Sequence, residues 1–420
     1  VTVTVRHADG REEDYRIERR LVEIHNTSSA LWDGGIAYID CDSFGNDTGT
    51  YFAQGIEKYD DDAHIFVVDI RNNTGGVTSS AVYALGTFTG PAYLLYLRDK
   101  AGSYRASVNY NEALTQDPVI VLTNRSSASA AEIFAADIRD CSAGILVGER
   151  TYGKGVAQIV YNWMNHPDLF DGDALKITAY RFYSADGNTN DLIGVLPTLL
   201  VSSNISQEVA KLLAAEAPRR AEGYLRLNLN GLPFYVDLET AQSEENQFAF
   251  DALLSALPPD AEVAVGERSS WVETTVQSVA ETYGGDDFQS RWFSDVADSP
   301  YADAINALAT YGILNGDSSG NFNPGGELTR SQLCALMAQA LGVGYSGESQ
   351  FADVPADRWY ASAVNAMAKL GFVEGYSDGT FQPDAPLTYE QFITFMSRLA
   401  AYLNLDVYEY VKDQDAQALA

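Results

Sequence analysis

At Val121-Leu-Thr-Asn-Arg-Ser-Ser-Ala-Ser129-Ala-Ala-Glu-Ile-Phe134, the chain passes from an apolar, strand-like run through a hydroxyl-rich turn into an alanine-rich helix. The turn presents Ser129 at the start of that helix. Backbone N–H groups are unpaired there, and the helix dipole favours negative charge. A serine in this place suits nucleophilic attack, because the oxyanion that it creates is stabilised where it forms. On this segment alone, a serine that only caps the helix explains the pattern better.

Two further turns that contain glycine follow apolar strands. The run 64–71 is typical of a buried strand and ends in Asn72-Asn-Thr-Gly75-Gly76. A strand over 144–148 precedes Gly153-Lys154-Gly155, in which a lysine lies between two glycines. Strands and helices alternate over this part of the chain, which predicts an α/β layered core.

A serine nucleophile needs a base, and Lys154 is the candidate. A lysine with the ordinary pKa of about 10.4 is protonated at neutral pH, but burial can lower the pKa of a lysine by several units. Gln158 can hold the amine by a hydrogen bond, and the oxyanion would lie between the backbone N–H groups of Gly76 and Ala130. Taken singly, Gly75-Gly76 fits an ordinary turn and Lys154 a solvated loop. Their joint presence favours an active site. None of the four histidines belongs to a catalytic motif or to a paired metal-binding motif. They are His7, His25, His64 and His166.

Three segments closely resemble the C-terminal processing (tail-specific) serine peptidases, namely 68–76, 121–133 and 147–155. In that family the nucleophile and the general-base lysine are 25 residues apart, which is the spacing of Ser129 and Lys154. The resemblance covers residues 1 to about 203 and implies a ClpP/crotonase-like layered fold. It implies Ser129 as nucleophile, Lys154 as general base and Gln158 as the orienting partner of Lys154. It further implies an oxyanion hole formed by Gly76 and Ala130, and neither a metal nor an organic cofactor.

Members of that family carry a PDZ domain before the peptidase core. Only residues 1–22 match it here, as its last strands, because Val1–Arg6 and Asp14–Leu21 alternate apolar and polar side chains. The chain has no initiator methionine and no signal peptide, so we expect an N-terminal truncation. Two departures from the family pattern remove no catalytic group. They are Thr74 in place of proline and an insertion from Asn162 to Gly172.

The C-terminal part of the chain repeats itself at an offset of 58 to 59 residues. The matching segments are 293–296 with 351–354, 316–322 with 375–381, and 328–330 with 387–389. They resemble S-layer homology domains, which implies all-α units. In that family the arginine of the Thr-Arg motif helps bind pyruvylated secondary cell-wall polymer. Arg330 fits that role, whereas Tyr389 replaces the arginine in the second copy. Repeats that only stack or dimerise are the alternative.

Composition limits the partners. The formal net charge of −31 should repel nucleic acid and anionic membrane surfaces, so we expect neither as a partner. No apolar run is long enough to span a bilayer. The cysteines Cys41, Cys141 and Cys334 fit neither a disulfide framework nor a metal motif.

These patterns divide the chain into eight parts. They are PDZ strands (1–22), peptidase core (23–203), connecting helix (204–221), small α/β accessory module (222–268), linker (269–290), S-layer homology repeats (291–343 and 349–405), and a tail leading to a missing third repeat (406–420). We expect a secreted serine endopeptidase with a Ser-Lys dyad that cleaves polypeptides near their C-termini. We further expect it to be anchored at the cell surface through secondary cell-wall polymer. Homo-oligomerisation stays open. The alternative is an inactive surface binding protein anchored by its repeats.

Overall fold

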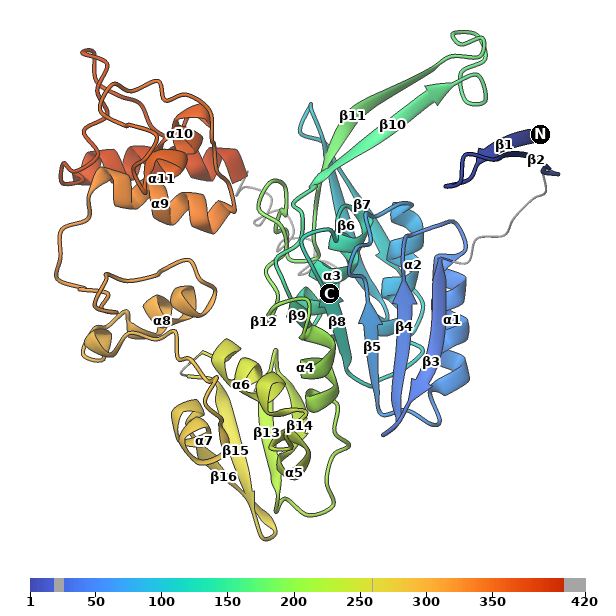
Figure 1. Cartoon of the computed structure of the whole chain (residues 1–420), viewed down its shortest axis with the longest axis horizontal. Coiled ribbons are helices and arrows are strands. Elements are labelled where there is room, and N and C mark those ends of the chain that lie inside the picture. Colours follow the sequence, from blue (N-terminus) through green and yellow to red (C-terminus); the bar gives the residue numbers. More distant parts are fainter. Residues whose placement is uncertain (19–25, 259, 404–420) are drawn as a thin grey trace.

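The protein is described by a computed structural model over residues 1–18, 26–258 and 260–403 (Figure 1). Its centre is a six-stranded sheet in the order β12-β9-β8-β5-β4-β3. Neighbouring strands are parallel, except for the antiparallel pair of β3 and β4. The six strands are β3 (Thr27–Trp32), β4 (Ile36–Cys41), β5 (Ile65–Asp69), β8 (Val119–Thr123), β9 (Gly144–Gly148) and β12 (Leu199–Leu200).

Both faces of this sheet are covered. Phe66 and Val68 of β5 pack with α1, α2 and α3 on one face, whereas Ile65 and Val67 pack with α4 on the other. Successive strand residues point to opposite faces, so a strand buried on both sides needs an unbroken apolar sequence. The predicted α/β core is confirmed. The covering helices are α1 (Thr48–Tyr59), α2 (Thr78–Thr89), α3 (Ala130–Asp140) and α4 (Ser206–Leu213).

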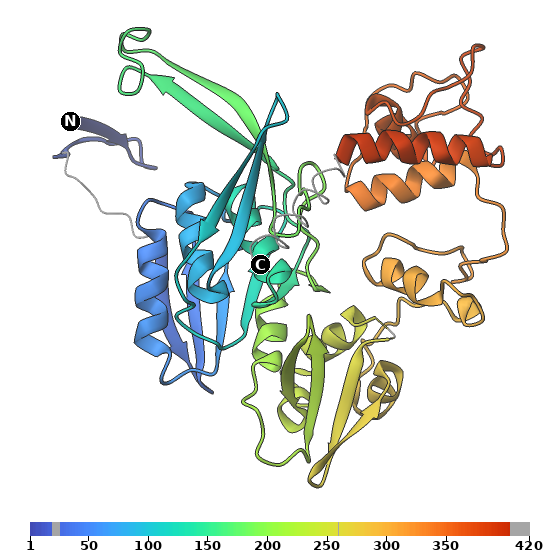
Figure 2. The ribbon, with the colours of Figure 1, turned by 180° about the vertical axis from the view of Figure 1, so that it is seen from behind.

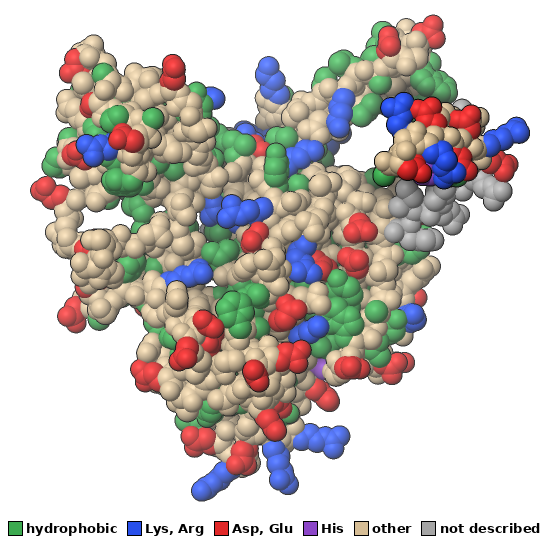
Figure 3. Space-filling view, viewed as in Figure 1, with side chains coloured by type: hydrophobic (Ala, Val, Ile, Leu, Met, Phe, Trp, Pro, Cys, Tyr) green, Lys and Arg blue, Asp and Glu red, His purple; other side chains and the backbone are tan. Residues whose placement is uncertain are grey.

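A second sheet, in the order β10-β11-β6-β7, carries a long hairpin that projects from the core (Figures 1 and 2). The predicted insertion from Asn162 to Gly172 forms most of its tip. Figure 3 shows hydrophobic side chains on this projection, and the exposed ones are Val160, Trp163, Met164, Leu169, Leu175 and Ile177. The four strands are β6 (Ala92–Asp99), β7 (Tyr104–Asn109), β10 (Val156–Asn162) and β11 (Ala174–Tyr183).

The accessory module extends past its predicted boundary at residue 268. Strand β16 pairs with β15, and Val276, Val279 and Ala280 of α7 are buried in the same apolar cluster as the rest of the module. The polar composition of residues 269–290 hides this amphipathic pattern in the sequence. The module consists of β13 (Tyr224–Leu229), β14 (Leu232–Asp237), α5 (Leu238–Ala241), α6 (Gln247–Ala256), β15 (Glu262–Glu267), β16 (Ser270–Thr274) and α7 (Val276–Tyr283).

In the C-terminal region, the aspartate of each Phe-x-Asp motif binds the backbone of a glycine-rich loop. Asp295 accepts hydrogen bonds from two backbone N–H groups of the following glycine-rich loop, at 3.0 and 2.7 Å. Asp353 does the same in the second repeat, at 2.7 Å for both bonds. Each aspartate therefore fixes its loop against the start of the repeat. The elements are η1 (Ser294–Val296), α8 (Ala302–Thr310), α9 (Arg330–Leu341), α10 (Ala361–Lys369) and α11 (Tyr389–Leu403).

At the N-terminal end, β1 (Thr2–Arg6) and β2 (Glu12–Arg16) form an isolated antiparallel pair. Several predictions fall on residues outside the described part of the chain. They are the end of the second strand at Leu21, the boundary between residues 22 and 23, the end of the second repeat at 405, and the tail 406–420.

Candidate active site

The turn that carries Ser129 is buried and strained. Ser129 has φ 60° and ψ −117°, a conformation that an L-residue rarely adopts, and its exposed fraction is 9%. Ser127 fixes the turn to the end of β5, because its Oγ donates a hydrogen bond to the carbonyl of Ile70 at 2.7 Å. The N–H of Ala128 donates to the carbonyl of Asn73 at 2.9 Å. Strain at one serine between a buried strand and a helix is typical of a catalytic nucleophile.

The Gly75-Gly76 turn lies directly against this serine. A Cβ atom placed on Gly75 would lie 2.7 Å from Ser129 Cβ and 2.6 Å from the carbonyl oxygen of Ala128. Both glycines have positive φ, 99° and 142°, so a side chain is excluded by space and by backbone conformation. Within the described residues, neither the Gly76 nor the Ala130 amide donates a hydrogen bond. Two unpaired donors therefore lie next to residues in close contact, one after Gly75 and one after Ser129, and an oxyanion hole needs such donors.

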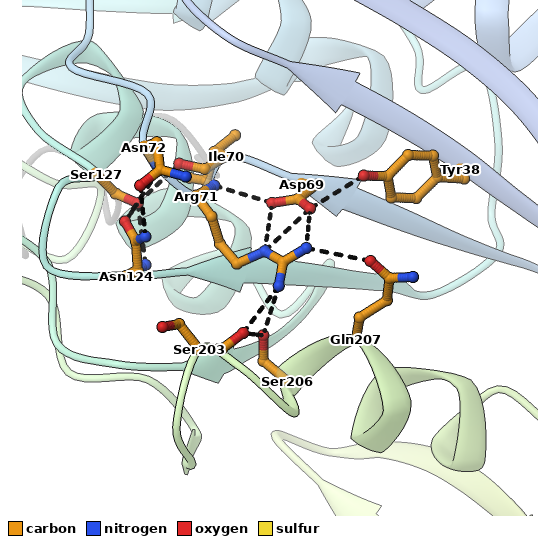
Figure 4. Close-up of polar contacts among 10 residues, drawn as sticks. All are labelled: Tyr38, Asp69, Ile70, Arg71, Asn72, Asn124, Ser127, Ser203, Ser206 and Gln207. Carbon is orange, nitrogen blue, oxygen red and sulfur yellow. Dashed lines mark hydrogen bonds and ion pairs between the residues drawn. The ribbon is translucent and has the colours of Figure 1, made fainter.

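A polar network fixes the strand end below these turns (Figure 4). The Arg71 guanidinium binds the Asp69 carboxylate and also donates to the carbonyl of Ser203 at 2.9 Å. The hydrogen bonds to Asp69 raise the pKa of Arg71. Asn72 and Asn124 exchange hydrogen bonds of 2.9 Å between the two turns. The network therefore joins β5, the Ser129 turn and the start of α4.

The Lys154 loop is tied to Ser129 by a buried carboxylate. Glu132 is fully buried in the first turn of α3. Its Oε2 atom accepts from the backbone N–H of Ser129 and from that of Lys154, both at 2.8 Å. Its Oε1 atom accepts from the Gly153 N–H at 2.7 Å and from the Thr151 hydroxyl at 2.5 Å. One side chain therefore brings the backbones of the predicted nucleophile and the predicted base to the same oxygen atom.

A second loop supports the Lys154 loop from the other side. The N–H of Leu192 donates to the carbonyl of Gly153 at 2.8 Å, and the N–H of Gly155 donates to Asp191 Oδ1 at 3.2 Å. A Cβ atom on Gly155 would lie 2.5 Å from that of Asp191. The glycines on both sides of Lys154 thus let two loops pass in close contact.

The side chains of the predicted dyad are not joined. Where the structure describes the chain, no hydrogen bond links Ser129 Oγ to Lys154 Nζ, and Lys154 Nζ has no ion-pair partner. Gln158 lies on β10 and donates to the hydroxyl of Thr178 at 3.4 Å rather than to Lys154. Catalytic hydrogen bonds are often long before substrate binds, so backbone proximity is the informative observation here.

Sequence reasoning missed two of these residues. The first is Glu132. The spacing Ser129-x-x-Glu132 is that of a capping box, so the sequence could have predicted the hydrogen bond from the Ser129 N–H to the Glu132 carboxylate. Its bonds to residues 151–154 could not have been predicted, because they join segments about twenty residues apart. Asp191 likewise acts through contacts that only the fold creates.

Arg330 is placed between the two repeats. It is 8% exposed, and its Nε and Nη2 atoms donate to the carbonyls of Phe381 and Glu374 at 2.9 and 3.1 Å. It also lines a groove of about 270 Å³ together with Arg398 and Tyr376. Arg330 therefore stabilises the junction of the repeats and also borders a groove.

Other reactive groups lie away from this centre. Burial raises the pKa of the Cys41 and Cys334 thiols to about 12, so both are inert at neutral pH. In the part of the chain that the structure describes, no three metal-binding side chains gather, and no helix has the length and apolarity to cross a membrane. Burial also raises the pKa of Asp137 far above its usual range.

Known families match two parts of the chain. Residues 35–201 match the model of peptidase family S41, and residues 293–334 and 350–393 match the S-layer homology domain. The chain carries a peptidase family S41 domain and S-layer homology domains. The S41 match contains Ser129, Lys154 and both supporting loops.

Curated relatives include C-terminal processing proteases. A carboxyl-terminal-processing peptidase 3 of Arabidopsis thaliana is 27% identical over 52% of this chain and 45% of its own length. A C-terminal processing peptidase of Tetradesmus obliquus is 32% identical over 37% and 34%. A probable CtpA-like serine protease of Staphylococcus aureus is 26% identical over 58% and 50%. The chain spans half or less of the length of these relatives.

A solved photosystem II D1 C-terminal processing protease is also similar. It is 24% identical with a TM-score of 0.40, and the match covers 52% of this chain and 61% of that one. The S41 and S-layer homology domains are therefore identified by the sequence matches.

Proposed function

We propose that the S41 domain is a serine endopeptidase in which Ser129 is the nucleophile and Lys154 the general base. The observation that supports this most is the shared Glu132 oxygen, which binds the backbone N–H groups of both residues. The strained backbone of Ser129 and the unpaired amides of Gly76 and Ala130 add to it. The fold is of the ClpP/crotonase-like layered type.

The reaction follows from these positions. Ser129 Oγ attacks the scissile carbonyl carbon while the neutral Lys154 amine takes the hydroxyl proton. The carbonyl oxygen becomes an oxyanion and accepts hydrogen bonds from the amides of Gly76 and Ala130. When the C–N bond breaks, the Lys154 ammonium returns its proton to the leaving amine. Water, deprotonated by Lys154, then hydrolyses the ester on Ser129 and restores the hydroxyl group.

Gln158 has a secondary place in this proposal. Its side chain bonds to Thr178 on the neighbouring strand, and a change of rotamer would let it orient the Lys154 amine. The proposed substrate class is an unstructured polypeptide segment near a C-terminus. Its support is that two of the relatives are named as C-terminal processing peptidases. Strands β1 and β2 would be the last strands of a PDZ domain. No metal or organic cofactor is required.

The repeats supply the location. S-layer homology domains indicate association with the cell surface or cell wall, and we place the protein outside the cell, bound to secondary cell-wall polymer. The groove lined by Arg330 and Arg398 is the proposed polymer site. A pull-down on purified wall polymer tests this site. Arg330→Gln should reduce binding, and unchanged binding would leave the repeats with a stacking role only.

A digestion of an unfolded protein tests the peptidase. The chain should cleave casein, and Ser129→Ala should abolish cleavage while far-UV circular dichroism stays the same. Cleavage that persists in Ser129→Ala removes Ser129 from the mechanism. A chain that does not cleave at all supports the alternative, an inactive surface binding protein anchored by its repeats.

A further inference from the structure

Two helices of the S-layer homology region end beside the loops that support Lys154. Both ribbon views show α11 ending toward the peptidase core (Figures 1 and 2), and hydrogen bonds join the core to the ends of α9 and α11. The last carbonyl groups of a helix lack partners within the helix and carry partial negative charge. An arginine of the core meets each of these two ends.

Arg150 caps the end of α9. Its Nη1 atom donates to the carbonyl of Ala340 at 2.9 Å and to that of Gln339 at 3.3 Å. Among the described residues, no carboxylate lies within ion-pair distance of Arg150. Burial, and to a lesser extent the like charge of Arg125, lowers the pKa of Arg150. Helix carbonyls, rather than an acid, therefore hold this guanidinium four residues before Lys154.

Arg181 caps the end of α11 and also connects it, through Asp191, to the Lys154 loop. Its Nη1 atom donates to the carbonyl of Tyr402 at 3.1 Å, and its Nη2 atom lies 3.2 Å from Asp191 Oδ2. The other oxygen of Asp191 accepts from the N–H of Gly155 at 3.2 Å. Three consecutive polar contacts thus lead from the end of α11 to the residue after Lys154.

Apolar packing joins the same loop to the repeats. Ile193 packs against the buried cluster formed by α9, α10 and α11. Its neighbour Leu192 donates to the carbonyl of Gly153. The loop 191–194 therefore lies between the repeats and the Lys154 loop and contacts both.

We propose that the S-layer homology domains hold the Lys154 loop in its catalytic position through these contacts, with Arg150 and Arg181 as positioning residues. The effect on rate rests on the proposed peptidase function, whereas the effect on the loop does not. Without docked repeats, loop 191–194 would lose the packing of Ile193 against the repeats, and Arg150 and Arg181 would lose their bonds to the ends of α9 and α11. Helices α9 and α11 also carry Arg330 and Arg398, which border the groove. The two helices that border the proposed polymer site therefore also support the Lys154 loop.

A pair of glycine variants tests this from the side of the repeats. Gly342 follows α9 with φ 65°, and a Cβ atom there would lie 2.9 Å from Arg150 Nη1. Gly371 follows α10 with φ 78° and has nothing within 4 Å of such an atom. Gly342→Ala and Gly371→Ala therefore impose similar backbone strain on the repeats, but only Gly342→Ala displaces the arginine. Gly371→Ala is the matched control.

An arginine pair tests it from the side of the core. Arg150→Gln removes the charge that meets α9, and Arg219→Gln removes an exposed charge for which the structure shows no side-chain bond in the described chain. All four variants are made in the full chain. Hydrogen exchange is followed in peptides that cover residues 151–155, and kcat and KM are measured on casein.

In Gly342→Ala and Arg150→Gln, amide exchange over residues 151–155 should be about tenfold faster than in the parent. Their kcat should be about tenfold lower, since small misplacement of a catalytic group is costly, with KM within twofold. Both controls should match the parent. Unchanged exchange in Gly342→Ala and Arg150→Gln, or an equal rise in Gly371→Ala, overturns the proposal. If the parent does not cleave casein, the proposed function fails, but the exchange result still decides whether the repeats hold the loop.

Discussion

The turn that carries Ser129 is held by contacts among the ends of neighbouring strands in the central sheet, whereas the loop that carries Lys154 is held by a helix side chain and by a separate loop. Ser127, Asn73 and Gly75 fix the serine within the carboxyl edge of the central sheet. The lysine loop depends on Glu132 on one side and on residues 191–194 on the other. The proposed nucleophile is therefore built into the sheet, and the proposed base is brought to it.

The backbones of Ser129 and Lys154 are both fixed, but the side-chain amine of Lys154 is not. The Ser129 backbone is strained and buried, so its position is determined before substrate arrives. The backbone N–H of Lys154 is fixed at Glu132, while Lys154 Nζ has no bonded partner among the described residues. A base placed in this way can be regulated through the loop that carries it, without any change at the nucleophile.

The largest effect is expected from Lys154, the proposed base. Lys154→Ala removes the proton acceptor and should lower kcat by about 10⁴-fold, a loss typical of a missing dyad or triad member. Lys154→Arg should be as inactive, because a guanidinium stays protonated. Steady-state cleavage of casein measures both, with Lys100→Ala as an exposed-lysine control. Near-normal activity in Lys154→Ala would contradict the comparison of the Ser129 turn with the Lys154 loop, because the loop would then carry no base.

A smaller loss is expected where the two regions meet. Glu132→Gln keeps the shape of the side chain but replaces one acceptor oxygen with an NH₂ group that faces N–H donors. Stability should fall by about 2 kcal/mol, because buried donors lose their partner. The value of kcat should fall by about 10²-fold, since the lysine loop shifts.

Denaturant unfolding and casein cleavage measure the two effects of Glu132→Gln. The exposed carboxylate of Glu57 offers the control Glu57→Gln. If activity falls without any loss of stability, Glu132 acts by a route other than hydrogen bonding to the two segments.

The nucleophile side should respond to Gly75→Ala. The new methyl group would meet Ser129 Cβ and the carbonyl of Ala128, and the residue would keep a φ of 99°. We expect kcat to fall about tenfold as the oxyanion amides move. Gly34→Ala shares the positive φ, 83°, but has open space around it, so it should retain activity. Equal kcat in the two variants would show that Gly75 is an ordinary turn residue.

The smallest effect concerns stability and pH. Burial raises the pKa of Asp137 above its unfolded value, so its neutral form is the one that the fold favours. Its contribution to stability is present below the unfolded pKa of about 3.9 and is lost as the pH rises through the folded pKa. Asp137→Asn should therefore match the parent near pH 4 and have a melting temperature about 3 °C higher at pH 8.

Thermal unfolding between pH 4 and pH 8 checks the Asp137 prediction. The exposed Asp171 provides the control Asp171→Asn. A difference in melting temperature that does not change with pH would mean that Asp137 is not held neutral.

Local sequence predicts the nucleophile side far better than the base side. The run Val119–Thr123, the hydroxyl turn and the alanine-rich helix form where the sequence places them, because each depends on neighbouring residues. Strand β16 escaped prediction although it forms a hairpin with β15, because it is short, largely exposed and part of the polar stretch 269–290. The support of the Lys154 loop by Asp191 escaped because it joins segments 36 residues apart, which only the fold brings together. Gln158 was expected beside Lys154, yet its bond is to Thr178 across the β10–β11 pair.

One measurement addresses the joining of the two regions most directly. A p-nitrophenyl ester is mixed with the chain, the reaction is quenched in acid, and the acylated peptide is located by mass spectrometry. We predict that the acyl group lies on Ser129, that Lys154→Ala forms it at least about 10³-fold more slowly, and that Ser129→Ala forms none. Acylation by the ester at another residue and not at Ser129, or equal acylation of Ser129 without Lys154, would contradict a Ser129–Lys154 dyad.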